Sequence, residues 1–507
     1  MNTESTAAGS VYLDYAATTP VDPRVAQRMA EVMSMSLGNA ASTHAEGLRA
    51  LELVDKARAQ LAALIGANSA EEVVFTSGAT ESNNLAITGT ARMALARNAK
   101  SQVVPHVITL ATEHKSVLEP VRALQAQGVA VSILRPGADG LLDPAVLAAA
   151  LRDETVLVSL LHVNNETGVA QDLPALAAVC AARGVPLHVD ASQSAGKLPV
   201  SITGLAMLSF TAHKLGGPQG IGALYVSPAH RGRLAPQMLG GGHERGLRAG
   251  TLPVHQIVGF GLAAELAAAA LPTEPARVAA LRERLWQGLR DLPGTLLNGH
   301  ATSRAPHILN ISFTGVEGES LYTALPELML STGSACSSRS GDASFVLRAL
   351  GRDTEQAQSA LRFSFGRRTT EAEVDRAIAA VRRAHAALWS HSPAQPPPWE
   401  DWSSGAGTQL LLGEAGELRL GAWVRFLVRA EAGVIREARV QVYGCPHTVA
   451  ACSHVRLQLA GRTLASPLPG TPEEWRNSVN APVEKLGRIL IIEDALRALR
   501  PASEASS

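Results

Sequence analysis

The sequence predicts an α/β fold with a mainly parallel sheet, a smaller α+β domain and a separate α+β module at the C-terminus. From about residue 11 to residue 226, short runs of β-branched residues alternate with helical stretches rich in Ala and Leu. This alternation is typical of parallel strands whose crossover helices cover both faces of a sheet. The length of 507 residues also exceeds what a single core usually supports, so we expect two or more domains.

The large sheet is expected to take its strands from five apolar runs, at residues 73–76, 107–110, 129–134, 156–158 and 185–189. In open sheets of this kind, ligands bind beyond the carboxyl ends of the strands. Residues 76–82, mostly Thr, Ser, Gly and Ala, follow the first run and precede a long helical pattern. Small residues there would let backbone N–H groups approach a phosphate, whose charge the helix dipole favours. A helix cap formed by Ser77 or Thr80 explains the same motif equally well.

Shorter elements follow this alternating part and indicate a second domain. We expect one unit over residues 1–391, in which a large domain covers about 20–265 and a small domain combines 1–19 with 266–391. The small domain has expected strands at 308–313 and 361–365 among helices, which is typical of α+β structure.

The remaining chain is expected to hold a linker, a module and a tail. Residues 392–407 are rich in Pro, Ser and Gly and predict a linker. Residues 408–500 predict a separate α+β module, with strands at 418–420, 423–430 and 434–443. We expect disorder in residues 501–507.

The composition indicates a globular protein without a strong overall field. Lys plus Arg equals Asp plus Glu at 45 each, so we expect no membrane and no direct nucleic-acid partner. The N-terminus lacks the basic and then apolar pattern of a signal peptide, and four cysteines are too few for a secreted disulfide framework. We therefore expect a cytoplasmic protein. Cys180, in an Ala-rich helical stretch, is expected to be a buried apolar residue.

One lysine and one aspartate, each just after an apolar run, indicate a pyridoxal phosphate site. Lys214 follows Thr211, Ala212 and His213, where such an enzyme would bind its cofactor covalently. Asp190 ends the preceding run, and a carboxylate there would keep the cofactor's pyridinium nitrogen protonated. Either motif alone is weak, because most such lysines are surface residues.

The ordered motifs resemble the cysteine desulfurases, a family of fold-type I pyridoxal phosphate-dependent transferases. The resemblance runs from Tyr12 to about Ala387. It includes residues 12–20, 77–82, 113–115, 162–166, 188–191, 240–246 and 333–336. One departure is Thr211-Ala212-His213 in place of a common Ser-Gly-His, which keeps the hydroxyl group but replaces a Gly with Ala.

The resemblance implies that L-cysteine is converted to L-alanine with pyridoxal 5'-phosphate as cofactor. Lys214 would bind the cofactor and move the substrate's α-proton, His114 would stack on the ring and handle protons, and Cys336 would take the sulfur as a persulfide. Arg362 and Asn165 would bind the substrate. Thr251 would reach the phosphate of the partner subunit, which implies a homodimer. The implied cofactor-binding residues are Ala79, Thr80, Asn165, Asp190, Gln193, Thr211, His213, Lys214 and Thr251.

Cys336 lies in residues 331–341, a run of small polar residues that is expected to be mobile. A mobile thiol could enter the site, attack the substrate sulfur and then carry it to an acceptor. Arg339 nearby would favour the thiolate. The alternative is an exposed thiol without a role, which its oxidation risk makes unfavourable.

The C-terminal module resembles the iron–sulfur cluster scaffold family through residues 438–445 and 492–495. That family surrounds its metal site with three cysteines, an aspartate and a histidine, and here Cys445 alone is kept. Cys452 comes seven residues later, about two helical turns if Pro446 opens a helix, or roughly 10 Å. We therefore expect a degenerate scaffold-like domain without a metal. It would dock against the desulfurase, accept sulfur on Cys445, or regulate access.

The expected function is a cysteine desulfurase that supplies sulfur for iron–sulfur cluster assembly or for thiolation of tRNA or cofactors. Its partner would be an iron–sulfur scaffold or another sulfur-acceptor protein. One alternative is a selenocysteine lyase-type enzyme of the same fold. The other is a weakly catalytic docking platform for sulfur transfer, which the joint presence of Lys214, Asp190, His114, Cys336 and Arg362 disfavours.

Overall fold

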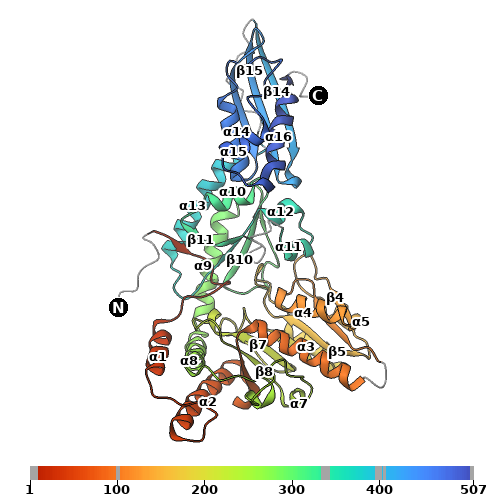
Figure 1. Ribbon diagram of the computed structural model, residues 1–507, viewed down its shortest axis with the longest axis vertical. Helices are drawn as coiled ribbons and strands as arrows, with labels where there is room; N and C mark the ends of the chain where they lie inside the picture. The colour runs from red at the N-terminus through yellow and green to blue at the C-terminus, as the bar shows by residue number, and fades with distance from the viewer. Residues whose placement is uncertain are drawn as a thin grey trace.

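The computed structural model describes residues 9–98, 103–332, 343–393, 395, 402 and 407–502. Three parts follow one another along the long axis of the molecule: a large domain, a small domain and the C-terminal module (Figure 1). In the described residues, no single helix is long and apolar enough to cross a membrane. Helices α8 (Val254–Ala270) and α9 (Glu274–Leu289) reach that length and composition only together, across a 76° bend.

The large domain contains a seven-stranded sheet in the order β2-β8-β7-β6-β5-β3-β4. All neighbours pair in parallel except β8, which runs antiparallel to both β2 and β7. The five strands expected from the sequence are confirmed, with ends that shift by a few residues. The strands are β2 (Val73–Thr76), β3 (His106–Leu110), β4 (Ala130–Leu134), β5 (Thr155–Leu161), β6 (Leu187–Asp190), β7 (Met207–Thr211) and β8 (Gly222–Val226).

Helices cover both faces of this sheet, so its central strands are buried throughout. Successive side chains of β2 alternate between the two cores: Val73 and Phe75 pack with α2, α6 and α8, whereas Val74 packs with α3 and α4. The helices are α1 (Pro23–Met33), α2 (Ala45–Ile65), α3 (Ala79–Asn98), α4 (Lys115–Ala126), α5 (Pro144–Ala150), α6 (Leu173–Ala182), α7 (Pro228–Arg231) and α8 (Val254–Ala270).

The small domain is built on a second sheet, in the order β12-β13-β10-β9. Its strands are β9 (Thr295–Leu297), β10 (Ile308–Phe313), β12 (Ser331–Thr332) and β13 (Ala360–Ser364). The N-terminal strand β1 (Val11–Tyr12) pairs with β11 (Leu328–Met329), so the start of the chain joins this domain. The helices are α9 (Glu274–Leu289), α10 (Gly318–Thr323), α11 (Phe345–Ala349), α12 (Thr354–Gln358) and α13 (Glu371–Trp389).

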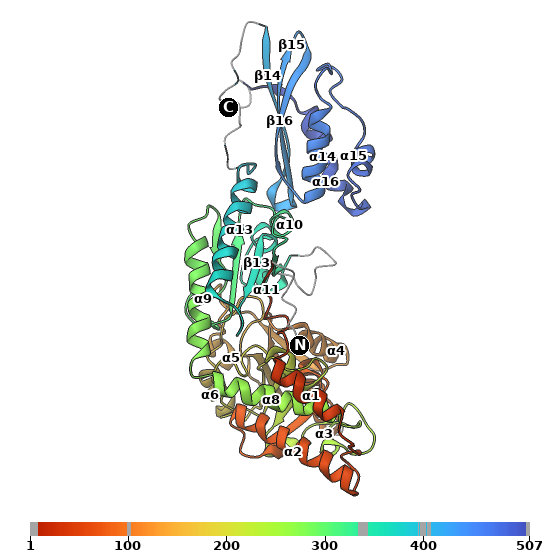
Figure 2. The same ribbon diagram turned by 90° about the vertical axis from the view of Figure 1, so that its left-hand side faces the viewer.

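The core of the small domain follows from helical periodicity. Apolar residues of α9 recur at Val278, Leu281, Leu285 and Leu289, and all of them are buried against β10 and α13. The start of α13 is fixed by a capping box, in which Thr370 and Glu373 each accept a hydrogen bond from the other's backbone N–H. Helices α9 and α13 lie lengthwise beside the sheet of the small domain (Figure 2).

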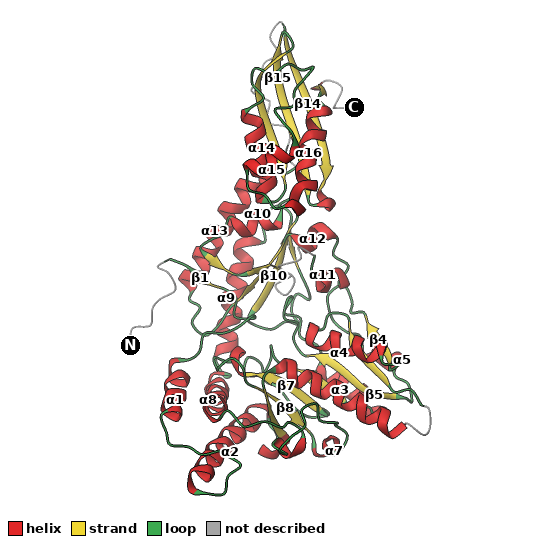
Figure 3. Cartoon of the chain, viewed as in Figure 1, coloured by secondary structure: helices red, strands yellow, loops and turns green. Residues whose placement is uncertain are grey.

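The C-terminal module has a four-stranded antiparallel sheet, β16-β15-β14-β17, with helices packed on one face (Figure 3). Alternate residues of β15, from Val424 to Ala430, form its core with α14 and α16. The elements are β14 (Thr408–Glu417), β15 (Ala422–Glu431), β16 (Val434–Tyr443), α14 (Pro446–Leu457), α15 (Pro472–Ser478), α16 (Leu486–Arg497) and β17 (Arg500–Pro501). Strands β15 and β16 and the helix opening at Pro446 confirm the expectations.

Two expectations for the module are wrong. Residues 418–420 form a 3₁₀ turn instead of a strand, because Gly421 closes it in a left-handed conformation and lets the chain reverse between β14 and β15. Pro501 is not disordered but pairs with Leu411 at the edge of the sheet, a position where proline's missing N–H is tolerated. Residues 503–507 lie outside the described part.

Candidate active site

A cavity of about 510 Å³ opens beyond the carboxyl ends of β2, β6 and β7. It brings together residues from across the large domain that the sequence predicted separately. The predicted cofactor, catalytic and substrate residues that line it are Ala79, Thr80, His114, Asn165, Asp190, Gln193, Thr211, His213 and Lys214. Arg362 and Thr251 do not line it, and Cys336 lies outside the described residues.

Asp190 ends β6 as a buried carboxylate with both oxygens hydrogen-bonded. Oδ1 accepts from the Ser192 backbone N–H at 2.9 Å, and Oδ2 accepts from Asn83 Nδ2 at 2.7 Å. Burial by itself would raise the pKa of Asp190, but these hydrogen bonds and the positive charge of Lys214 lower it overall. The site therefore holds an ionised carboxylate in a position that the sequence predicted for pairing with a pyridinium.

A chain of hydrogen bonds connects Asp190 to His114. Asn83 Nδ2 donates to Asp190 and also, at 2.8 Å, to Ser116 Oγ. Because Ser116 Oγ accepts from Asn83, its own hydrogen is available for His114 Nδ1, 2.8 Å away. The Ser116 backbone N–H also donates to His114 Nδ1, at 3.1 Å.

These contacts fix the tautomer of His114. A nitrogen that accepts from two donors carries no hydrogen, so the proton of the neutral ring is on Nε2. Burial lowers the pKa of His114, against the opposing effect of Asp190, and keeps the ring neutral. His114 is also the N-cap of α4, so the capping interpretation and the functional one describe the same side chain.

The N-terminus of α3 forms another wall of the cavity. Ala79 and Thr80 are its first residues, and the helix has 20 residues, enough for a full dipole. Gly222 of β8 lies against the preceding turn, where an added Cβ would come within 2.6 Å of the Gly78 backbone. The missing side chain at Gly222 therefore permits this close packing of strand and turn.

Lys214 ends a 3₁₀ turn, η2 (Ala212–Lys214), directly after β7. The N-terminal segment holds this turn, because the Thr19 hydroxyl donates to the His213 carbonyl at 2.7 Å. His213 Nδ1 lies 3.1 Å from the Thr18 hydroxyl, and burial lowers the pKa of His213 to about 4. Thr18 and Thr19 of the N-terminal segment therefore lie beside the turn that carries Lys214.

Gln193 and Asn165 lie on different loops at the cavity wall. Gln193 Nε2 donates to the Ala16 carbonyl at 2.7 Å, which connects the residue to the N-terminal segment. The backbone carbonyl of Asn165 accepts from Arg362 at 2.8 Å, so the arginine lies directly behind a residue that lines the cavity.

Arg362 is buried in β13 and is already paired. Its NH2 group donates to Asp14 Oδ1 at 2.8 Å and to Ser331 Oγ at 3.0 Å. Its Nε atom is buried and has no hydrogen-bond partner among the residues that the structure describes. The guanidinium is therefore held close to the cavity with one donor unused, which is an unfavourable state for a buried polar atom.

Thr251 is exposed, in the loop between η3 (Glu244–Gly246) and α8. A buried ion pair anchors this loop: Arg58 donates to both Glu244 carboxylate oxygens, at 2.7 and 2.8 Å. Glu244 also accepts from the Phe75 backbone N–H at 2.7 Å, next to the strand that leads to α3. Thr251 is thus held away from the cavity of its own chain on an anchored, outward-facing loop.

The module contacts the small domain through the end that carries Cys445. Ser320 Oγ of α10 donates to the Gly444 carbonyl at 2.7 Å, Lys485 pairs with Glu319 at 2.7 Å, and Arg488 pairs with Glu317 at 3.4 Å. Cys445 is completely buried there. Burial would lower the pKa of Arg488, but its neighbours Cys445 and Glu317 raise it overall.

The second cysteine of the module, Cys452, is buried on α14, where burial raises the pKa of its thiol. Cys180 is also buried, as expected from the sequence. Among the residues that the structure describes, no group of three or more His, Cys, Asp or Glu side chains is arranged to hold a metal ion.

Some residues of the site were not predicted from the sequence. Asp14 lies inside a quoted motif, Asn83 directly follows another, and Lys197 comes four residues after its partner Gln193. Their other partners, Arg362, Asp190 and His307, are far away in sequence. Each acts through contacts with a predicted residue. A sequence pattern could have placed them near the site but not assigned their partners.

The cavity fits pyridoxal 5'-phosphate by its donor set. It offers a buried carboxylate at Asp190, a helix N-terminus at Ala79, and the buried Ser192 hydroxyl, which has no hydrogen-bond partner within the described part of the chain. The carboxylate suits a pyridinium, and the helix start suits a phosphate.

Comparison with known proteins establishes the family. Residues 11–377 match the class-V aminotransferase model, so the chain belongs to the class-V aminotransferase family, whose members use pyridoxal 5'-phosphate.

Within this family, the chain is 51% identical over 400 residues to the cysteine desulfurase IscS of Escherichia coli O139:H28, covering 78% of this chain and 96% of that protein. The protein of the same name from Salmonella arizonae matches to the same extent.

Solved structures agree with this assignment. DndA from Streptomyces lividans is 41% identical, covers 70% of this chain and 99% of its own, and superimposes with a TM-score of 0.58. A structure described as SspA in complex with cysteine is 35% identical, covers 70% of this chain and 99% of its own, and has a TM-score of 0.63. The predicted fold class and the resemblance to cysteine desulfurases are confirmed.

Proposed function

We propose that the chain is a pyridoxal phosphate-dependent cysteine desulfurase that converts L-cysteine to L-alanine and collects the sulfur on Cys336. The observation that carries this proposal is the single cavity in which Lys214, Asp190 and His114 meet. The 51% identity to a cysteine desulfurase over most of the chain supports the substrate. We expect the sulfur to pass to an iron–sulfur scaffold or another acceptor protein.

Pyridoxal 5'-phosphate, when bound, supplies an electron sink for negative charge that develops on the substrate's α-carbon. Asp190 would hold the pyridinium proton, because its carboxylate is kept ionised by Asn83 and the Ser192 N–H. The backbone N–H groups at Ala79 and Thr80 would hold the phosphate, with the hydroxyl of Thr211 and His213 nearby. Gln193 and Asn165 would orient the ring from the opposite loops.

Proton transfer is assigned to two side chains. Lys214 Nζ would bind the cofactor covalently and, after the substrate has displaced it, take the α-proton. His114 presents a hydrogen on Nε2, because Ser116 occupies Nδ1. His114 can therefore donate from Nε2 into the cavity without first changing its tautomer.

Arg362 would bind the substrate carboxylate. Its fork of donors suits a carboxylate. In this arrangement NH1 and NH2 are already paired, and Nε is buried without a partner among the described residues, so binding would require the substrate to replace one of these contacts. Asp14 and Ser331 hold the NH2 end, so the guanidinium is oriented before substrate arrives.

Transfer of the sulfur atom from L-cysteine to Cys336 requires no external oxidant. The Cys336 thiolate attacks the substrate sulfur, a new S–S bond forms, and the C–S bond breaks with its electron pair left on the substrate's β-carbon. That carbon takes up a proton and becomes the methyl group of alanine. Cys336 retains the sulfur as a persulfide.

We propose a homodimer in which Thr251 contributes to the partner subunit's phosphate site. The position of Thr251 supports this, because it is exposed and its loop is anchored by the buried Arg58–Glu244 pair. A residue such as Thr251, which is held in place but lies outside the cavity of its own chain, is suited to contact the phosphate site of the partner subunit.

For the C-terminal module we propose a degenerate iron–sulfur scaffold-like domain whose main role is docking against the small domain. Burial of Cys445 at the contact with α10 supports docking over sulfur acceptance in this arrangement. Transfer of the persulfide to Cys445 would require the module to move away from Ser320 and Glu317.

The test is turnover of L-cysteine by Cys336→Ser with Cys180→Ser as the matched control. Cys336→Ser should keep the cofactor's visible spectrum but release no sulfide, whereas the control should be active. Mass spectrometry after turnover should locate the persulfide on Cys336 in the wild type. Undiminished sulfide release by Cys336→Ser would refute the assignment, and sulfur on Cys445 would refute the docking role of the module.

A further inference from the structure

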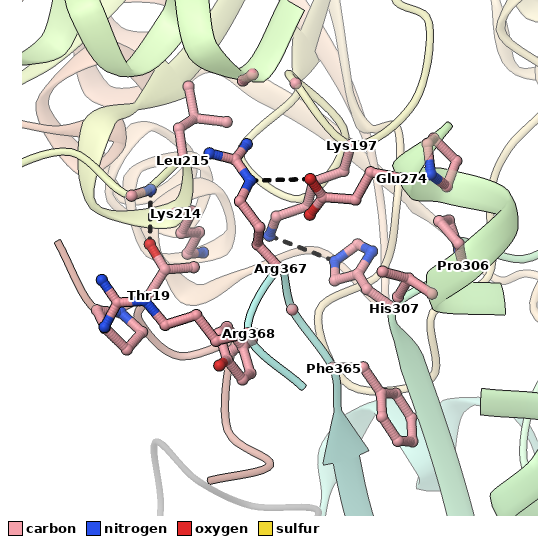
Figure 4. Close-up of a pocket in the computed structure, with 18 of the residues that line it drawn as sticks. Thr19, Lys197, Lys214, Leu215, Glu274, Pro306, His307, Phe365, Arg367 and Arg368 are labelled. Carbon is pink, nitrogen blue, oxygen red and sulfur yellow. Dashed lines mark hydrogen bonds and ion pairs between the residues drawn. The ribbon is translucent and has the colours of Figure 1, made fainter. Parts of the chain in front are cut away.

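Lys197 lies beside two proposed functional residues, Gln193 and Lys214, and has no part in the mechanism above. It lines a second cavity, of about 80 Å³, that also reaches Lys214 and is bounded by both the large and the small domain (Figure 4). The charged residues that line this cavity are Asp22, Lys197, Lys214, Glu274, Arg367 and Arg368.

The ammonium of Lys197 contacts the oxygen end of the Gln193 amide. Lys197 Nζ lies 3.4 Å from Gln193 Oε1 and 3.4 Å from His307 Nε2, and that same His307 nitrogen lies 3.3 Å from Gln193 Oε1. On the other side, Gln193 Nε2 donates to the Ala16 carbonyl. Because Lys197 can only offer donors when charged, the amide oxygen must face it and the NH2 group must face Ala16.

His307 does not replace Lys197 as the charged group. Burial, with the charge of Lys197 next, lowers the pKa of His307 well below its ordinary value, so the ring is neutral. A neutral imidazole can donate or accept at Nε2 according to its tautomer. It therefore stabilises the cluster but cannot by itself decide which end of the Gln193 amide faces the cavity.

The nearby carboxylates do not neutralise Lys197. Glu274 pairs with Arg367 at 2.9 Å, and Asp22 lies 3.5 Å from the same guanidinium (Figure 4). Burial, followed by the charge of Lys214, lowers the pKa of Lys197 to about 7; Glu274 opposes this shift and Arg362 adds to it. Lys197 is thus a cation below neutral pH in an electrostatic field that it shares with Lys214.

Two amines that share a site titrate as a pair, since each charge disfavours the other. A lysine that must take a proton from carbon has to be uncharged near neutral pH. A neighbouring cation is one of the established ways to achieve this in a protein.

We propose that Lys197 is a positioning residue: it fixes the orientation of the Gln193 amide and, when protonated, disfavours the charged form of the Lys214 amine that borders the same cavity. This inference rests on the proposed function, because it takes Lys214 as the cofactor lysine and Gln193 as a cofactor contact. The residue touches neither cofactor nor substrate and acts through these two side chains.

The test is a pH titration of the cofactor's visible absorbance in the holoenzyme, with Lys197→Met, Lys197→Arg and the surface control Lys56→Met. Lys197→Met removes the charge, so the apparent pKa of the absorbance should rise by on the order of one unit, and activity at neutral pH should fall by on the order of tenfold. Lys197→Arg keeps a cation and should restore most of both. Lys56→Met should match the wild type.

The possible outcomes separate this inference from the proposed function. A Lys197→Met enzyme with the wild-type absorbance pKa, or equal loss in Lys197→Met and Lys197→Arg, would overturn the positioning role. Failure of both variants to fold would assign Lys197 to stability alone and would also overturn it. If the visible absorbance survives in Lys214→Ala, then the proposed function itself is wrong, whatever Lys197 does.

Discussion

The large domain and the C-terminal module use buried polar groups in opposite ways. In the large domain, Asp190, Asn83, Ser116 and His114 form a continuous hydrogen-bond chain that ends at a cavity of about 510 Å³. In the module, Cys445 is completely buried and Arg488 pairs with Glu317 of the small domain, and neither residue lines that cavity. A reactive side chain alone therefore does not form a functional site, because polar neighbours must orient it and a cavity must give a ligand access.

The largest expected difference between the two regions is in catalysis. Lys214→Ala should lose the cofactor's visible absorbance and at least about 10³-fold of the cysteine desulfurase activity, because no other group would bind the cofactor and take the α-proton. Cys445→Ala should retain activity within about twofold, since its thiol is buried away from the cavity. Alanine formation from cysteine measures both. Equal losses would show that the module takes part in the chemistry.

The next effect is on stability in the large domain. Arg58→Met should lower the free energy of unfolding by about 3–5 kcal/mol, because it leaves the buried Glu244 carboxylate without its bidentate partner. Urea denaturation followed by tryptophan fluorescence and circular dichroism measures this. Arg58→Met with Glu244→Gln should recover part of the loss, and a loss below about 1 kcal/mol in the single variant would show that the pair contributes little.

The buried carboxyl group of Glu166 makes the stability of the large domain depend on pH. Burial raises the pKa of Glu166 to about 7, although its hydrogen bond from Ser344 opposes the shift. The carboxyl is therefore neutral in the folded protein at a pH where it ionises in the unfolded chain. Its stabilising contribution is complete below about pH 4.5 and decreases as pH rises to about 7, by on the order of 3 kcal/mol.

Glu166→Gln should remove this pH dependence, because an amide does not titrate. The melting temperature of the two proteins, measured between pH 5 and about pH 8, tests the prediction. Parallel curves would mean that Glu166 titrates normally in the folded state.

Effects at the contact of the module should be smaller. Arg488→Met removes the ion-pair partner of the buried Glu317 carboxylate. This should weaken docking of the module by about 1–3 kcal/mol. Limited proteolysis should then cut between α13 and β14 faster than in the wild type. Unchanged cleavage would show that the Ser320–Gly444 hydrogen bond and apolar packing suffice.

The smallest effect is expected for the partly exposed Lys485–Glu319 pair. Lys485→Met should change docking by less than about 1 kcal/mol, because solvent screens such pairs. The same proteolysis assay measures it. A loss as large as that of Arg488→Met would show that the pair is shielded from water.

The sequence predicted most of the large sheet because its central strands are continuous apolar runs. Strand β3 is one example, since Val107, Ile108 and Leu110 are apolar and all of its residues are buried. Strand β14 was not predicted, because Gly413, Gly416 and exposed polar residues interrupt its pattern. Gly413 is required there by packing: an added Cβ would lie 2.0 Å from the Ala495 carbonyl oxygen of α16. Such a contact depends on tertiary structure that a local pattern does not contain.

The site was predicted where residues lie in ordered motifs and missed where long-range partners decide. His114 was expected from its motif, but its tautomer follows from Asn83 and Ser116, which are 33 residues apart. Arg362 was expected to face the substrate, whereas in the structure it is paired with Asp14, 348 residues earlier. Lys197 gave no signal, because its environment comes from His307 of the small domain.

The covalent connection between α13 and β14 has a consequence for competition. Because the module is covalently attached to the domain that it contacts at α10, its effective concentration at that surface is on the order of millimolar. A separate protein with micromolar affinity for the same surface would need to be present at a concentration that overcomes this local excess. We therefore expect a binding partner that acts in trans to contact surfaces that the attached module leaves open.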